Sequence, residues 1–224
     1  MRTFWTIAIL LLGPVAGAIG GRKLRKAPPR QVIYMSNALN LVVLGAITAA
    51  VDLTHGHRAI SLFISAPSMR SLAIWIAATA ALAIVVVALT LLLRVVLRRP
   101  PKQSVLMLLP RSASEKIAFA VLCVLIAVVE EYIYRGFALI SLRDWLRSDL
   151  LSAVLVCLSF ALMHGLQDFI AIIGAFVQGV VLTIPVLAMH SLVPSVVGHF
   201  MVDLFAGIFL LRFLQRFQLI SNAT

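Results

Sequence analysis

The chain has 224 residues, of which 62% are hydrophobic and only 12% are charged. Soluble domains carry about 25% charged residues, so this composition cannot supply a water-soluble surface. The formal net charge of +11 does not indicate nucleic acid as a partner, because the Lys and Arg residues are scattered between apolar stretches and do not gather on one soluble face. We interpret them as topology signals and contacts with lipid head groups, so the lipid bilayer is the expected partner.

The hydropathy pattern predicts an all-α, polytopic transmembrane helical bundle. About seven spans are expected, near residues 3–21, 33–51, 71–93, 117–140, 150–164, 169–190 and 193–211. Most of these stretches approach the roughly 20 residues that a helix needs to cross the hydrocarbon core. Thirteen Lys and Arg residues fall on one side, in 22–30, 94–116 and the tail, and five fall on the other. This bias predicts an N-terminus outside and a C-terminus in the cytoplasm.

Two proline pairs mark the basic connections, at Pro28-Pro29 and at Pro100-Pro101. A proline costs little where no helix has to continue, so both pairs indicate breaks between helices. The second pair suggests a division into residues 1–100, N-terminal transmembrane helices of unassigned role, and residues 101–224, which hold the chemistry. Cys123 and Cys157 lie inside apolar segments, where we interpret them as small buried hydrophobes.

Ionisable side chains gather in the last four predicted spans. Each ionised group at the centre of a bilayer costs about 2.5 to 3.5 kcal/mol on insertion scales, so each needs a partner and a function. The first three spans contain almost none, which locates the chemistry in the C-terminal half. The candidates are Glu130, Glu131, Arg135, His164, His199 and Asp203.

Spacing within the helices suggests how these groups are used. Glu131 lies four residues before Arg135, so the two share a helical face and can neutralise each other. Glu130 is rotated by about 100° from Glu131, which leaves its carboxylate free to face another helix as a general base. Phe160 and His164 share a face of the fifth span, and His199 and Asp203 share a face of the seventh.

A glutamate and two histidines from three helices can therefore converge on one water molecule. The motifs Glu-Glu-x-x-x-Arg at 130–135, Phe-x-x-x-His at 160–164 and His-x-x-x-Asp at 199–203 occur in this order on successive spans. In this order they resemble the CPBP family, the CAAX protease and bacteriocin-processing (Abi) family of intramembrane glutamate proteases. The resemblance covers roughly residues 115 to 211.

The resemblance implies roles for individual residues. Glu130 would be the general base, and His164 would help to hold the attacking water. His199, with Asp203 beside it, would stabilise the oxyanion, and the Glu-Arg pair of the first motif would give structural support. The more common family residue at position 203 is asparagine, and aspartate can donate a hydrogen bond only when protonated. Asp203 could instead orient His199 or bind a metal.

A zinc enzyme is the alternative mechanism, because Glu130, His164, His199 and Asp203 are all acceptable zinc ligands. No local spacing such as His-Glu-x-x-His supports it, and the resemblance favours a reaction without a metal, so no cofactor is expected. Ser159 and Ser195 lie near the two histidines in the sequence. We give a serine-protease mechanism little weight, because proximity in sequence does not supply the geometry of a triad.

The leading functional hypothesis is an intramembrane endopeptidase that cuts a membrane-associated peptide, in CAAX-type, bacteriocin or immunity-related processing. A proton-coupled transporter could use the same groups as a relay, but transporters often carry inverted repeats, and here only one half is polar. A non-catalytic membrane scaffold could dispense with Glu130 or His199, and both are present. Short loops favour a bacterial plasma membrane, where a prenylated substrate is not expected.

The predicted spans leave one mismatch in depth. Glu130 lies fourteen residues after Lys116, which is roughly 21 Å along a helix. His164 falls much nearer the cytoplasmic edge. We therefore expect that the fifth helix starts later than residue 150 and runs past Gly165, or that the helices are tilted or of unequal length.

Overall fold

The computed structural model describes residues 1–20, 28–56, 58–65, 68–164 and 168–219, and every element within these ranges is helical. The elements in chain order are α1 (Arg2–Gly20), α2 (Arg30–Leu53), α3 (Arg58–Ser61), α4 (Met69–Val96), α5 (Gln103–Leu108), α6 (Ala113–Glu131), the π-helix η1 (Tyr132–Ala138), α7 (Leu139–Leu146), α8 (Asp149–Met163), α9 (Phe169–Met189) and α10 (Val193–Arg216).

The predicted all-helical membrane bundle is confirmed, and each predicted span coincides with a helix. The fourth span is one continuous helical segment, in which α6, η1 and α7 follow one another without a break. Five helical segments are long and apolar enough to cross a membrane: α2, α4, the α6–α7 segment, α9 and α10. Within the described residues α1 and α8 count only as shorter apolar helices, so the total of seven spans and the orientation of the termini stay predictions.

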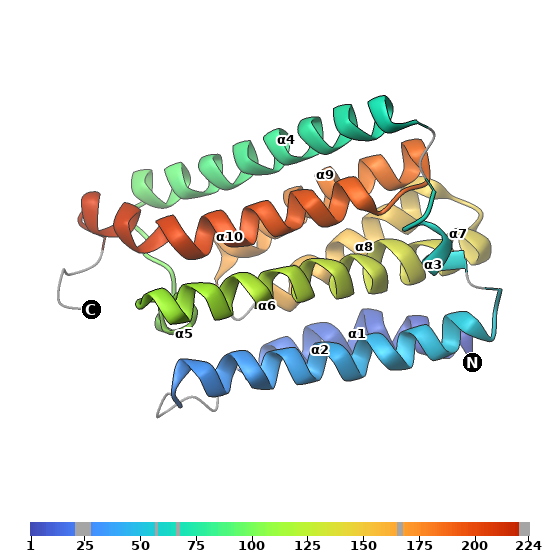
Figure 1. Cartoon of the computed structure of the whole chain (residues 1–224), viewed down its shortest axis with the longest axis horizontal. Helices are drawn as coiled ribbons and strands as arrows, with labels where there is room; N and C mark the ends of the chain where they lie inside the picture. Colours follow the sequence, from blue (N-terminus) through green and yellow to red (C-terminus); the bar gives the residue numbers. More distant parts are fainter. Residues whose placement is uncertain (21–27, 57, 66–67, 165–167, 220–224) are drawn as a thin grey trace.

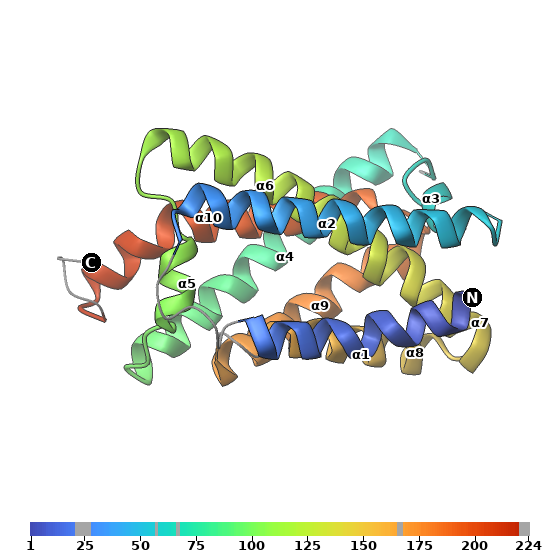
Figure 2. The ribbon, with the colours of Figure 1, turned by 90° about the horizontal axis from the view of Figure 1, so that it is seen from below.

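The helices of the last four predicted spans, which contain the ionisable residues, lie in the middle of the bundle. Figure 1 shows α4 along one outer side and α1 with α2 along the other, with α6, α8, α9 and α10 between them. Figure 2 shows the same helices from below, with α1 beside α8 and α2 beside α6. The helix α10 packs against both α4 and α6, and α9 packs against α8 and α4. Large apolar side chains such as Val43, Leu89 and Phe209 face outward, as a lipid environment allows.

Polar caps determine where the inner helices begin. Ser112 and Glu115 form a reciprocal capping box at the start of α6, and the Ser148 hydroxyl accepts a hydrogen bond from the Leu151 amide at the start of α8. The helix α8 has 15 residues, or about 22 Å, which is less than the roughly 30 Å of a hydrocarbon core. It begins at Asp149, so the expected start later than residue 150 is wrong, and it ends at Met163 with His164 as C-cap. The helices are of unequal length, as the second alternative expects; residues 165–167 lie outside the described ranges.

A buried ion pair joins the end of α4 to the start of α9. The Arg94 guanidinium donates two hydrogen bonds to the Asp168 carboxylate, at 2.9 and 3.0 Å. Asp168 is also the N-cap of α9 and accepts a hydrogen bond from the Ala171 amide at 2.9 Å. One carboxylate therefore both starts α9 and attaches it to α4.

We expect this pair to make stability depend on pH in the acid range. Burial by itself would raise the pKa of Asp168, but the hydrogen bonds from Arg94 and from the Ala171 amide outweigh it and lower the pKa below its usual range. The stabilisation should be complete above the unfolded-state pKa of about 3.9 and be lost as the pH falls through the folded-state pKa. In thermal unfolding in detergent, Asp168→Asn should therefore be less stable than the unsubstituted protein at pH 7, and the gap should narrow as the pH falls below about 4.

Asp149→Asn is the matched control, because Asp149 is largely exposed and pairs with Arg143 at the surface. Exposed pairs contribute about 0 to 1 kcal/mol, so this substitution should change little at any pH. A gap between Asp168→Asn and the unsubstituted protein that stays constant from pH 7 to pH 3 would contradict the assignment.

Candidate active site

The Glu131 carboxylate is the centre of the polar cluster. Its side chain is completely buried, and one oxygen, Oε1, accepts hydrogen bonds from Arg135 Nη1 at 3.0 Å and from His199 Nδ1 at 2.8 Å. The pairing of Glu131 with Arg135 is therefore present as predicted. The bond to His199 was not predicted, and it ties α6 directly to α10.

Arg135 extends the cluster to two more helices. It is fully buried in η1, donates from Nη2 to the Gly179 carbonyl at 3.3 Å, and lies with its guanidinium carbon 4.3 Å from the centre of the Phe160 ring. Gly179 belongs to α9 and Phe160 to α8. All seven residues of η1 are buried. Single π-helical turns inside α-helices, called π-bulges, are frequent at functional sites. One side chain thus holds α8 and α9 against the segment that carries the paired glutamates.

The bond to Glu131 determines which nitrogen of His199 faces the other carboxylates. A carboxylate can only accept, so His199 Nδ1 carries the proton in this bond. The other nitrogen, Nε2, lies 3.9 Å from Glu130 Oε2 and 3.5 Å from Asp203 Oδ2. Both distances exceed the usual limit of about 3.2 Å for a nitrogen–oxygen hydrogen bond. The Nε2 atom is therefore close to two carboxylates but available to a ligand.

His164 is held in a similar way from its own helix. Its Nδ1 donates to the Phe160 carbonyl at 2.9 Å, which leaves Nε2 as its available nitrogen. Its ring lies 4.9 Å from the Phe160 ring, and the His199 ring lies 5.9 Å from the same ring in an edge-on arrangement. The two imidazoles therefore flank one phenylalanine.

The predicted catalytic residues line one cavity of about 350 Å³. Glu130, His164, His199 and Asp203 all contribute to its surface, together with mostly apolar residues from α4, α5, α6, α9 and α10. The Glu130 side chain is 17% exposed, whereas the Glu131 side chain is completely buried. The structure thus brings the four predicted residues together, and it places Glu131 and Arg135 behind them, outside the cavity lining.

Two alternatives from the sequence can be compared with the geometry. Among the residues that the structure describes, no three His, Cys, Asp or Glu side chains form a group that could hold a metal ion, so the proposed zinc set of Glu130, His164 and His199 is not such a group. The Ser159 hydroxyl donates to the Leu10 carbonyl at 2.9 Å. The Ser195 hydroxyl donates to the Leu182 carbonyl at 2.6 Å. Both hydroxyls therefore join helices to one another.

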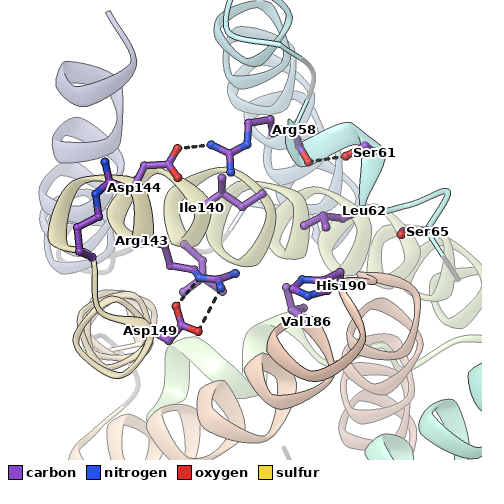
Figure 3. Close-up of a pocket in the computed structure, with 12 residues that line it drawn as sticks. Arg58, Ser61, Leu62, Ser65, Ile140, Arg143, Asp144, Asp149, Val186 and His190 are labelled. Carbon is purple, nitrogen blue, oxygen red and sulfur yellow. Dashed lines mark hydrogen bonds and ion pairs between the residues drawn. The ribbon is translucent and has the colours of Figure 1, made fainter. Parts of the chain in front are cut away.

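A larger cavity of about 590 Å³ lies against α3, α7 and the C-terminal end of α9. Figure 3 shows two of its arginines paired, Arg58 with Asp144 and Arg143 with Asp149. None of the residues predicted to be catalytic lines this cavity. The predicted chemistry therefore belongs to the smaller cavity.

Gln178 is a polar residue of the active-site cavity that sequence reasoning missed. Gln178 of α9 lies in its lining, with a side chain that is almost completely buried. The prediction considered only ionisable side chains, although a primary amide in an apolar span is also costly to bury. The amide of Gln178 in an apolar span was therefore the sequence signal that could have identified this residue.

Glu130, His164 and His199 thus face one cavity inside a helical membrane bundle. Residues 112–205 match the family model described as Type II CAAX prenyl endopeptidase Rce1-like. This segment carries the similarity to the CPBP family, whose members are peptide hydrolases. The matched segment runs from the cap of α6 into α10 and contains all six predicted site residues. Comparison with curated proteins and with solved structures gave no match.

The two adjacent glutamates should respond differently to substitution. Glu131→Ala would leave the buried Arg135 charge without its carboxylate, which costs about 3 to 5 kcal/mol. Glu130→Gln should change the free energy of unfolding by less than about 1 kcal/mol, because Glu130 is partly exposed and its Oε2 lies 3.9 Å from His199 Nε2. Chemical denaturation in detergent micelles measures both.

The double substitution Glu131→Ala with Arg135→Met is the control for this difference. It removes the uncompensated charge and should recover part of the stability that Glu131→Ala loses. Equal losses for the two single substitutions would contradict the structural assignment of Glu131.

Proposed function

We propose that the chain is an intramembrane endopeptidase that hydrolyses a membrane-associated peptide with a water molecule activated by Glu130. The observation that carries this proposal is the different environment of the adjacent residues Glu130 and Glu131. Glu131 is occupied by two buried hydrogen bonds, while Glu130 lines a cavity beside two imidazoles. A carboxylate that is not needed for structure is available for proton transfer.

In the proposed reaction Glu130 accepts a proton from water as the water oxygen attacks the peptide carbonyl. His164 would accept the second hydrogen bond of that water at Nε2, since its Nδ1 donates to the Phe160 carbonyl. Together the two groups would orient a lone pair of the water toward the carbonyl carbon. When the carbon–nitrogen bond breaks, Glu130 returns the proton to the leaving amine.

His199 would stabilise the oxyanion of the tetrahedral intermediate. This requires a proton on Nε2 in addition to the proton that Nδ1 donates to Glu131, so the ring would be a cation in this step. Asp203, 3.5 Å from Nε2, would favour that cation by its charge. The aspartate in place of the usual family asparagine is thus proposed to hold and balance His199.

The remaining parts of the chain have proposed supporting roles. Glu131 and Arg135 would keep His199 and the glutamate-bearing helix in place. Residues 101–224 would form the catalytic bundle, and residues 1–100 would complete it, since α4 contributes Val86, Thr90 and Arg94 to the cavity lining. We further propose a bacterial plasma membrane, with the N-terminus outside and the C-terminus in the cytoplasm.

The substrate is proposed to be a peptide with apolar residues, cut near its end. The lining is mostly apolar, and the family description names a CAAX prenyl endopeptidase. CAAX-type processing and processing related to bacteriocins or immunity both fit this chemistry. A membrane-anchored peptide would reach the cavity already concentrated in the plane of the bilayer.

The test uses the purified protein in liposomes with a peptide that ends in a CAAX sequence, with and without a farnesyl group, and with a membrane protein extract. Mass spectrometry of new peptide termini measures cleavage. Glu130→Ala and His164→Ala should each lower turnover at least about 100-fold, because each removes a group from the proton transfer or from water positioning. Both variants should remain folded.

Ser159→Ala is the matched control, because its hydroxyl is directed to the Leu10 carbonyl and should not take part in the reaction. Retained turnover in both Glu130→Ala and His164→Ala would overturn the mechanism. Turnover that disappears on chelation and returns only with zinc would replace it with the metalloenzyme alternative.

A further inference from the structure

The helix α9 presents one strongly polar side chain to the active-site cavity. Gln178 is 6% exposed, and neither its Nε2 nor its Oε1 has a hydrogen-bond partner among the residues that the structure describes. A buried polar group without a partner costs about 1 to 3 kcal/mol, so an apolar residue of the same length would serve the fold better. A ligand in the cavity that forms hydrogen bonds with this amide would explain why a glutamine stands at this position.

The position of Gln178 in the helix directs it toward that ligand. Ala171, Gly174, Ala175 and Gln178 follow one another at helical spacing and all line the cavity. The first three are small, so the amide of Gln178 is the large polar group on this face of α9. It lines the same space as Glu130 and His199.

The backbone of Gln178 is fixed by the network that also holds the catalytic residues. Its neighbour Gly179 accepts a hydrogen bond from Arg135 at 3.3 Å, and Arg135 is paired with Glu131, the carboxylate that holds His199. There is little room at Gly179 for movement, since a Cβ there would lie 3.3 Å from Arg135 Nη2. The backbone from which the Gln178 side chain extends is therefore fixed relative to the site.

The chemistry of a primary amide matches that of a peptide backbone. Its nitrogen donates and its oxygen accepts, as do the N–H and C=O groups of a residue in an extended chain. A residue in an antiparallel pair exchanges both of these bonds with one partner, and a glutamine side chain can stand in for that partner. Such binding does not depend on the side chains of the peptide, and it leaves the apolar lining to select among them.

We propose that Gln178 binds the backbone of the peptide substrate, donating from Nε2 to a carbonyl and accepting at Oε1 from an N–H group. It thereby holds an extended segment beside the bond that is cut. Gln178 is a substrate-binding residue that takes no proton from the reacting atoms. This inference rests on the proposed function in one respect, that the ligand of the cavity is a peptide.

The first test is Gln178→Met, which keeps the length of the side chain and removes both polar atoms. The affinity for the farnesylated CAAX peptide, measured by fluorescence anisotropy in liposomes, should fall roughly tenfold or more with the loss of two hydrogen bonds. This comparison uses the inactive Glu130→Ala background, so it does not depend on turnover. The melting temperature should stay unchanged or rise, because an unpaired buried amide has been removed.

Thr183→Val is the matched control on the same helix. The Thr183 hydroxyl donates to the Gly179 carbonyl at 2.8 Å, and Thr183 is not among the cavity-lining residues. Its removal should lower the melting temperature and leave peptide affinity unchanged, the opposite of the result expected for Gln178→Met. A lower melting temperature with unchanged peptide affinity in Gln178→Met would overturn the proposal and make the amide a structural group.

A second test identifies the backbone contact on the peptide. A series of peptides, each with one N-methyl group on a different backbone nitrogen, is compared between Glu130→Ala and Glu130→Ala with Gln178→Met. One methyl position should weaken binding to the first protein and have no further effect on the second. Equal sensitivity of both proteins at every position would overturn the proposal. Binding that depends on Gln178 in a protein that cleaves no peptide would contradict the proposed hydrolysis and preserve the inference.

Discussion

The structure depends on one buried carboxylate. Glu131 has no exposed surface, and its oxygen is shared between the Arg135 guanidinium and the His199 ring. Charges in a membrane interior are costly unless they are paired and hydrogen-bonded, so the helices that bring these three groups together are constrained to a single arrangement. Through Arg135 that constraint reaches Gly179 on α9 and Phe160 on α8. The site is therefore assembled by the same contacts that specify the bundle.

Adjacent glutamates perform separate tasks because a helix turns about 100° per residue. Glu131 faces the protein interior, and Glu130 faces the cavity. The same separation appears in His199, where one ring nitrogen is bonded to Glu131 and the other is directed toward Glu130 and Asp203. A structural hydrogen bond on one ring nitrogen thus determines which nitrogen faces the cavity, as the hydrogen-bond partner of a histidine does at other sites.

Much of this site could be predicted from the sequence, because ionisable groups in apolar spans are rare and their spacing on a helix fixes their directions. The Glu131–Arg135 pair and the common cavity of Glu130, His164 and His199 follow from that reasoning. The bond between Glu131 and His199 could not be predicted, since it depends on how α6 and α10 pack. The length of α8 could not be predicted either, because it depends on the caps of the helix. Gln178 was missed because its side chain is polar but uncharged.

The short α8 has a consequence for the supply of water. A helix of about 22 Å in a hydrocarbon layer of roughly 30 Å creates a hydrophobic mismatch, which a bilayer relieves by local thinning. At the end of α8, His164 donates hydrogen bonds to three of the last carbonyl groups, from its backbone N–H to Ala161 and Leu162 and from Nδ1 to Phe160. His164 lies at this end of α8 and lines the catalytic cavity. The hydrolysis proposed above needs water at this cavity, and bilayer thinning around a short α8 would bring the aqueous phase toward it.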